Sequence, residues 1–204
     1  GLPTSVGGVT VNRLCASGLQ SIMDAFRAIK NDDGVIYLAG GTESMTRAPF
    51  VFAKSDSAFS RKAEIFDTTI GWRFTNKKLA ELHHPYSMGE TAENVAEKWK
   101  VSRDEQDKFA LASQEKYAAA YNAGKFKSEF VPVKIQNAKG EEILFDKDEH
   151  PRATSLEKLS QLKPAFKKDG TVTAGNSSGV NDGAACLILV SENTLKEMNL
   201  TPLA

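Results

Sequence analysis

The sequence predicts an α/β fold in which helices cover a parallel or mixed sheet and a long polar segment is inserted into the chain. Residues 9–39 read as strand, helix and strand within about 30 residues, which is typical of a βαβ unit. Residues 184–190 form the longest apolar run and predict a buried strand. Residues 49–168 are polar, so we expect a layered core interrupted by an insertion.

The first region begins with a β-branched stretch and then changes to a helical period. Residues 9–11 follow two glycines and predict the end of a strand. Asn12 is the predicted helix N-cap, and the Asn-Asp-Asp-Gly sequence at 31–34 predicts the helix end. Residues 35–39 predict a second strand, which stops at a Gly-Gly pair. The apolar helical positions, at spacings of 4, 3, 4 and 3 residues, are Cys15, Leu19, Ile22, Phe26 and Ile29.

The inserted segment predicts two helices, a small ribbon and a short helix. The apolar side of the first helix consists of Ala92, Val95, Ala96 and Trp99. The second helix opens with a capping box formed by Ser102 and Glu105. Residues 131–135 and 143–145 predict the ribbon, and residues 155–162 predict the short helix.

A loop rich in Gly, Asn and Ser at 171–183 leads into the apolar run at 184–190. That run has no strand partner nearby in the sequence, so we expect it to return to the sheet begun near the start of the chain. We therefore assign residues 1–49 and 171–204 to a core, and residues 50–170 to an inserted loop domain.

Composition excludes several classes of function. Lys plus Arg and Asp plus Glu each number 26, so zero net charge gives no general attraction to nucleic acid or an acidic membrane. The apolar run at 184–190 is far shorter than the roughly 20 residues that span a bilayer. Two cysteines form no disulfide framework, which favours a reducing, cytoplasmic location. The chain opens on Gly1 instead of Met, which suggests processing or an excised fragment.

Cys15 is the candidate nucleophile. It is predicted near the first turn of a helix, where the partial positive charge of the helix end favours the thiolate, the form that attacks a thioester. Its small neighbours at 16–18 would admit an acyl chain. The same periodicity also fits a small core residue on the apolar side of the helix. Residue pattern alone leaves both interpretations open.

The remaining cysteine and the histidines suggest no further chemistry. Cys186 lies inside the apolar run and is predicted to be a core residue. No histidine has a metal-ligand spacing with another His, Cys or carboxylate, so we expect no metal site. The three histidines expected on the surface or in loops are His83, His84 and His150.

Four motifs, taken in order, resemble those of the thiolase family. They are N-R-L-C-A-S-G at 12–18, G-G-T-E-S-M at 40–45, S-M-G-E-T-A-E-N-V-A at 87–96 and T-V-T-A-G-N-S-S-G-V-N-D-G-A-A at 171–185. The set covers almost the whole chain. The resemblance implies a thiolase-like layered fold and an acyltransferase in which Cys15 is acylated by a coenzyme A thioester.

The resemblance also implies substrate contacts in the insertion. It places Met88 in the wall of the acyl pocket and Ser178 beside the pantetheine arm of coenzyme A. It places Arg152 against the adenine, where a guanidinium plane can stack, and a solvated surface Arg is the alternative. Many family members have His at the position of Ser87. The glycines at 173–183 allow close approach to a ligand, and they also suit an ordinary turn into a strand.

Thiolase subunits are about twice as long as this chain, and they take a Gly-His-Pro histidine and a second cysteine from their other half. Neither motif occurs in these 204 residues. We therefore expect an incomplete N-terminal half, with the C-terminal half absent and little turnover by this chain alone. The resemblance implies acyl-CoA and coenzyme A as substrates, no further cofactor, a homodimer or homotetramer, and no nucleic acid or membrane partner.

The sequence leaves alternatives for the acyl group of the substrate and for the class of reaction. A general 3-oxoacyl-CoA thiolase of fatty acid degradation ranks first. Residues 66–74 resemble the 3-oxoadipyl-CoA thiolase branch of aromatic degradation, and Arg73 there could meet the free carboxylate of a dicarboxylate. The same loop could instead serve assembly. The rival functions are a ketoacyl synthase-type condensing enzyme and a non-catalytic coenzyme A-binding or assembly module.

Overall fold

The computed structural model describes all residues from 1 to 204 and divides them into two compact units. The first unit combines Gly1–Ala48 with Asn181–Ala204, and the second is Pro49–Val180. Residues 171–180, which the sequence pattern grouped with the core, belong to the second unit. Neither unit contains a helix with the length and apolar character needed to cross a membrane.

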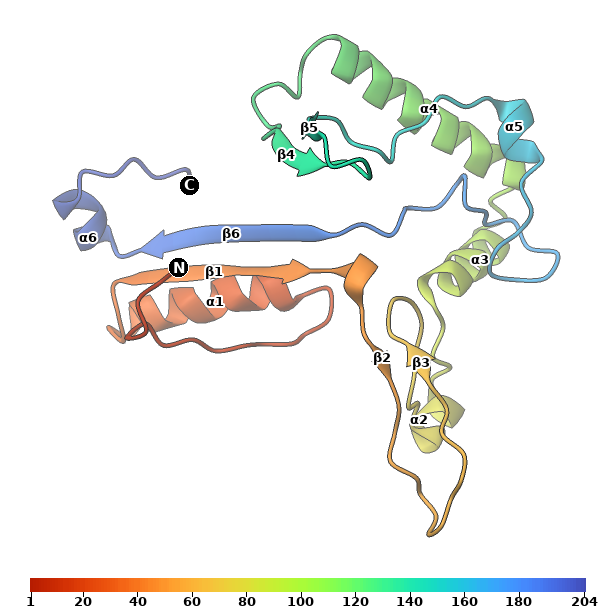
Figure 1. Ribbon diagram of the computed structural model, residues 1–204, viewed down its shortest axis with the longest axis horizontal. Helices are drawn as coiled ribbons and strands as arrows, with labels where there is room; N and C mark the ends of the chain where they lie inside the picture. The colour runs from red at the N-terminus through yellow and green to blue at the C-terminus, as the bar shows by residue number, and fades with distance from the viewer. The chain divides into compact units, whose positions relative to one another are not determined.

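The first unit is built on a two-stranded sheet with a helix along one face (Figure 1). β1 (Ile36–Glu43) and β6 (Gly183–Val190) pair antiparallel over eight residues, and α1 (Ser17–Lys30) contacts both strands. The short η1 (Met45–Arg47) and α6 (Glu192–Glu197) follow the two strands. The expected return of the closing strand to the first sheet is therefore confirmed.

Two details of the predicted sheet are wrong. Residues 9–11 form no strand, and the observed pair is antiparallel, whereas a βαβ unit would give parallel strands. The reason is that β6 offers β1 a partner of equal length, with paired residues from Ile36↔Val190 to Glu43↔Gly183. Three residues between a glycine pair and the turn at Asn12 are at the short limit of strand length.

The expected burial of the closing strand, and of Cys186 within it, is also wrong. The helix covers only one face of the strand pair, the face that includes the buried Ala39. Cys186 and Ile188 lie on the other face, where Cys186 is exposed and Ile188 is 69% exposed. The buried side of α1 contains Ala25, whereas Leu19 and Phe26 of the predicted apolar stripe remain exposed.

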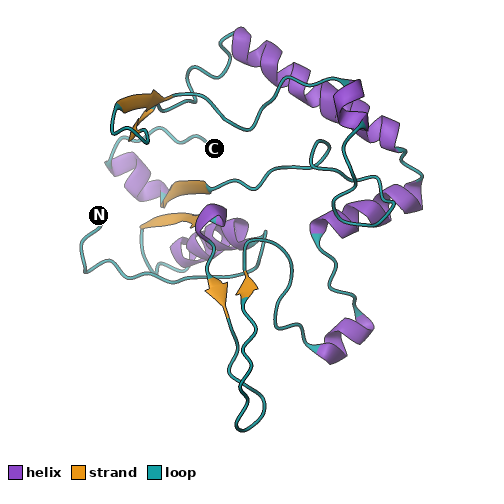
Figure 2. Cartoon of the chain, turned by 45° about the vertical axis from the view of Figure 1, so that its right-hand side comes forward, coloured by secondary structure: helices purple, strands orange, loops and turns teal.

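The regular secondary structure of the second unit is mainly helical, and long loops connect it (Figure 2). The predicted helices, ribbon and short helix are all confirmed. They are α3 (Met88–Trp99), α4 (Arg103–Asn122), the antiparallel ribbon of β4 (Val133–Gln136) and β5 (Glu142–Phe145), and α5 (Leu156–Ser160). Three elements were not predicted: the small ribbon of β2 (Phe50–Val51) and β3 (Phe66–Asp67), and α2 (Lys77–Leu82).

The core of the second unit is unusually polar. Its buried apolar side chains are few and small: Ala96, Leu159 and Val172. Three polar residues of this unit are also buried: Glu93, Asp107 and Thr173. Because buried polar groups cost free energy unless they are hydrogen-bonded, the arrangement of this unit depends on how these groups are paired.

Candidate functional site

Cys15 lies in a tight turn immediately before α1. The helix begins at Ser17 with Ala16 as its N-cap, so the prediction of Asn12 as the N-cap is wrong. The Asn12 carboxamide oxygen instead accepts the Leu14 N–H at 3.0 Å. The Ser17 hydroxyl accepts the Arg13 N–H at 2.8 Å and donates to the Leu14 carbonyl at 2.7 Å. These local bonds compete with helix formation, which delays the helix start.

The backbone of this turn is strained at the residue before the cysteine. Leu14 has a φ of +50°, in the left-handed region that a bulky residue rarely adopts. Such conformations concentrate at active sites, where the surrounding structure holds them in place. Cys15 itself is exposed, which contradicts the alternative of a buried core residue. The turn therefore presents a free thiol to solvent at the positive end of α1.

Met88 is the first residue of α3 and is 79% exposed. Ser87 before it is the N-cap, and its hydroxyl accepts the Glu90 N–H at 3.3 Å. The Glu90 carboxylate accepts the Ser87 N–H at 2.8 Å, and this bond is the main cause that lowers the pKa of Glu90. Ser87 thus has a structural role, which its Ser-x-x-Glu spacing could have predicted.

Arg152 and Ser178 are exposed and lie on segments that contact each other. Gly179, next to Ser178, packs so closely on the His150 ring that a Cβ at this position would overlap the ring. The Arg152 backbone N–H donates to the Gln114 side chain at 2.9 Å, while its guanidinium forms no ion pair. Two side chains predicted to contact coenzyme A are therefore brought to neighbouring segments of the second unit.

A buried carboxylate shapes the loop that leads to Ser178. Glu93 is only 4% exposed, and its Oε1 atom accepts the N–H groups of Thr171 and Val172, each at 2.8 Å. The Thr171 hydroxyl also donates to Glu93 at 3.1 Å. Burial by itself would raise the pKa of Glu93, but the bonds from Val172 and Thr171, with the nearby Lys167, lower it overall.

A second buried carboxylate continues this network. Asp107 pairs with Arg103 at 2.8 Å and accepts the Asn176 amide at 3.0 Å. Arg103 also donates to the Leu159 carbonyl at 2.6 Å, which ties α4 to α5. The sequence does not predict this network, because both carboxylates resemble ordinary helix residues and their partners in the loop at 171–176 lie 79 and 69 residues away.

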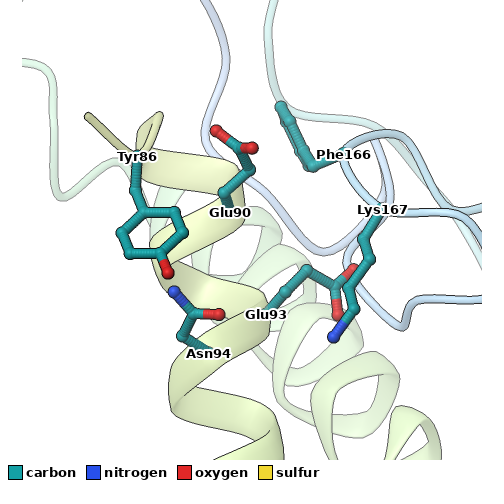
Figure 3. A pocket seen from close by; sticks show the side chains of 6 residues that line it. All are labelled: Tyr86, Glu90, Glu93, Asn94, Phe166 and Lys167. Carbon is teal, nitrogen blue, oxygen red and sulfur yellow. The ribbon is translucent and has the colours of Figure 1, made fainter. Parts of the chain in front are cut away.

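A shallow cavity of about 210 Å³ opens between α3 and the segment around Phe166 (Figure 3). It contains none of the predicted site residues, and its Lys167 is already paired with Glu97 at 2.9 Å. The lining residues are Tyr86, Glu90, Glu93, Asn94, Phe166 and Lys167. No group of three or more His, Cys, Asp or Glu side chains lies close enough together to hold a metal ion.

Comparison with known proteins gives consistent matches. The family model "Thiolase, N-terminal domain" matches residues 1–193. The chain is 55% identical over its whole length to the beta-ketoadipyl-CoA thiolase of Escherichia coli, and covers 51% of that protein. It is equally identical to the 3-oxoadipyl-CoA/3-oxo-5,6-dehydrosuberyl-CoA thiolase of Escherichia coli strain K12. A probable acetyl-CoA acyltransferase of Staphylococcus aureus is 47% identical.

Solved structures agree with these relatives. The human mitochondrial 3-ketoacyl-CoA thiolase superposes with a TM-score of 0.80 at 42% identity, covering 100% of this chain and 51% of that one. The same human enzyme in complex with CoA gives a TM-score of 0.75 at 43% identity, with 95% and 47% covered. The chain thus spans about half the length of the curated relatives it matches.

Proposed function

The chain belongs to the thiolase family, and on this basis we propose that the protein containing it is an acyltransferase that cleaves 3-oxoacyl-CoA through an acyl intermediate on Cys15. The observation that supports this most directly is the strained turn that exposes the Cys15 thiol before α1. The N-R-L-C-A-S-G sequence of that turn lies within the matched family domain.

The proposed reaction has two steps. The Cys15 sulfur attacks the 3-oxo carbon, the bond between C2 and C3 breaks, and its electron pair leaves with acetyl-CoA, whose C2 takes up a proton. The thiol of a second coenzyme A then attacks the acyl thioester on Cys15. Acyl-CoA is released, the cysteine leaves as thiolate, and the thiol proton passes to a base. The reverse sequence is a Claisen condensation of acetyl-CoA.

In this proposal the second unit contributes the contacts to coenzyme A, which is a substrate, and no further cofactor is needed. The exposed Arg152 guanidinium stacks on the adenine, Ser178 lies beside the pantetheine arm, and Met88 borders the acyl group. The exposure of all three side chains and the contact between Gly179 and His150 support this assignment. The proposed protein partner is a second copy of the same protein, in a homodimer or homotetramer.

The proposed acyl substrate is 3-oxoadipyl-CoA. The relatives at 55% identity carry names that specify 3-oxoadipyl (beta-ketoadipyl) groups. The corresponding metabolic role would be the breakdown of aromatic compounds. A general 3-oxoacyl-CoA substrate is the alternative, and the names of the human and Staphylococcus proteins favour it.

The test is covalent labelling of the intact gene product with acetyl-CoA, followed by mass spectrometry of the cysteine peptides. An acetyl group is expected on Cys15, to be retained in Cys186→Ser and lost in Cys15→Ser. Both thiols are exposed, so alkylation rates of the two cysteines compare reactivity and not access. Acetylation of Cys186 alone would refute the proposal. Coenzyme A binding without any acetylation would instead support a non-catalytic binding module.

A second measurement tests the division of the reaction between the two halves of the family subunit. We expect the purified 204-residue chain to cleave acetoacetyl-CoA far more slowly than the intact gene product, because proton transfer needs a base that Cys15 does not have nearby in sequence. Normal turnover by the chain alone would contradict this expectation.

A further inference from the structure

Arg73 is a partly exposed residue whose guanidinium has no carboxylate partner. Only two arginines of the chain are shielded from solvent, Arg73 and Arg103. Arg103 forms an ion pair with Asp107 and donates hydrogen bonds to two carbonyl groups. Arg73 donates from Nη1 to the Gly71 carbonyl at 2.7 Å and forms no ion pair. Most of its five N–H donors therefore remain available to a ligand.

The loop that carries Arg73 is held in place by its aromatic side chains. Phe66 and Phe74 pack edge to face with ring centroids 5.2 Å apart. The Trp72 indole N–H donates to the Tyr86 carbonyl at 3.1 Å. Tyr86 is two residues before Met88, the side chain proposed to border the acyl group. Arg73 is therefore attached, through its neighbour in sequence, to the start of α3.

The acidic residue of this loop, Asp67, already has a hydrogen-bond partner. Asp67 accepts the Thr69 N–H at 2.8 Å. The hydrogen bonds from Thr69 are the main cause that lowers the pKa of Asp67, and the charge of Arg73 contributes least. Asp67 thus forms no ion pair with Arg73.

We propose that Arg73 determines substrate specificity by binding the free carboxylate at the far end of a dicarboxylic acyl-CoA. A guanidinium offers two parallel N–H groups that match the two oxygens of a carboxylate, so the pairing is directional as well as charged. A substrate that ends in a methyl group leaves the guanidinium solvated and gains nothing from it. This inference rests on the proposed acyl transfer and names the acyl class that the protein accepts.

The test compares two substrates of equal carbon number on the intact gene product. 3-Oxoadipyl-CoA ends in a carboxylate, and 3-oxohexanoyl-CoA ends in a methyl group. Arg73→Gln is expected to lower kcat/KM for 3-oxoadipyl-CoA about ten- to hundredfold and to leave 3-oxohexanoyl-CoA unchanged. Arg73→Lys, which keeps the charge and loses the fork, should restore part of the activity. Arg61→Gln, at an exposed arginine of the same unit, is the matched control and should change neither.

The outcomes separate this inference from the proposed function. If the unaltered protein cleaves neither substrate, the acyl-transfer proposal fails. If it cleaves both and Arg73→Gln lowers both equally, Arg73 only supports the loop, and the specificity role is overturned. Unchanged activity toward 3-oxoadipyl-CoA in Arg73→Gln overturns it as well. A melting temperature close to that of the unaltered protein shows that the loss is not a folding defect.

Discussion

Replacing Glu93 by Gln is expected to destabilise the second unit by about 2–3 kcal/mol, although the two side chains have almost the same shape. The Glu93 carboxylate is 4% exposed and accepts the N–H groups of Thr171 and Val172. Hydrogen bonds to a charged acceptor are each worth about 1.5–3 kcal/mol. Both backbone N–H groups donate to Oε1, which Gln keeps only as a neutral acceptor, whose hydrogen bonds are each worth about 0.5–1.5 kcal/mol. The NH₂ group of Gln replaces Oε2, which accepts the Thr171 hydroxyl at 3.1 Å in the unaltered chain.

Unfolding in urea, followed by tryptophan fluorescence, measures this effect directly. Both tryptophans, Trp72 and Trp99, belong to the second unit, so the signal reports that unit alone. Glu97→Gln on the same helix is the matched control. Its side chain is 67% exposed and paired only with Lys167, so the expected loss is much smaller than in Glu93→Gln. Equal losses in the two variants would refute the reasoning.

The same carboxylate predicts a pH dependence. Burial raises the pKa of Glu93, but the hydrogen bonds it accepts lower it further, so the folded pKa lies below the ordinary value of 4.5. The unfolded chain therefore binds the proton more tightly than the folded chain. The contribution to stability is complete above about pH 4.5 and is lost as the pH falls through the folded pKa. The difference between Glu93→Gln and the unaltered chain should shrink over that interval. A difference that stays constant down to the folded pKa would contradict this account.

Three further changes probe the contacts around the site. Gly179→Ala should change the free energy of urea unfolding by no more than about 0.5 kcal/mol, because its Cβ overlaps only the outer atoms of the exposed His150 ring, which can turn away. A loss of about 1–3 kcal/mol, the usual cost of overpacking, would show that the ring is held in place. Thr46→Val removes the hydroxyl that donates to Asp182 at 2.6 Å, the largest cause of the low pKa of that carboxyl. An NMR titration should show the Asp182 pKa rise toward 3.8. Ser87→Ala should destabilise α3 by about 1 kcal/mol, whereas Ser87→Asp should retain the cap.

The helices of the second unit could be predicted because their signals are local. The capping box at Ser102 and Glu105 marks the start of α4, and the structure contains both of its bonds. The start of α1 was placed too early for a related reason. Asn12 and Ser17 both carry side chains suited to cap a helix, and only the three-dimensional turn shows that Asn12 serves Leu14 instead.

The pairing of the sheet could not be predicted in direction, because it depends on residues far apart in sequence. β1 pairs with β6 from Ile36↔Val190 to Glu43↔Gly183, and the whole second unit lies between these two strands in sequence. A strand, helix and strand pattern favours a parallel neighbour only when both strands are long enough to form a ladder. Residues 9–11 are not, and nothing in the local pattern of β1 identifies β6 as its antiparallel partner.

The family motifs contain residues that shape a loop as well as residues proposed to contact the substrate. Within the second unit, the hydrogen bonds distinguish the two. Glu93 and Asn176 belong to motifs that suggested a ligand site, yet both are occupied in holding the loop before Ser178. A loss of coenzyme A affinity in Glu93→Gln would therefore follow from a displaced loop, and the urea experiment would show a matching loss of stability. Ser178→Ala should weaken binding without a change in unfolding, since its hydroxyl makes no bond to the protein. Comparing the two variants distinguishes the residue that contacts the substrate from the residue that shapes the loop.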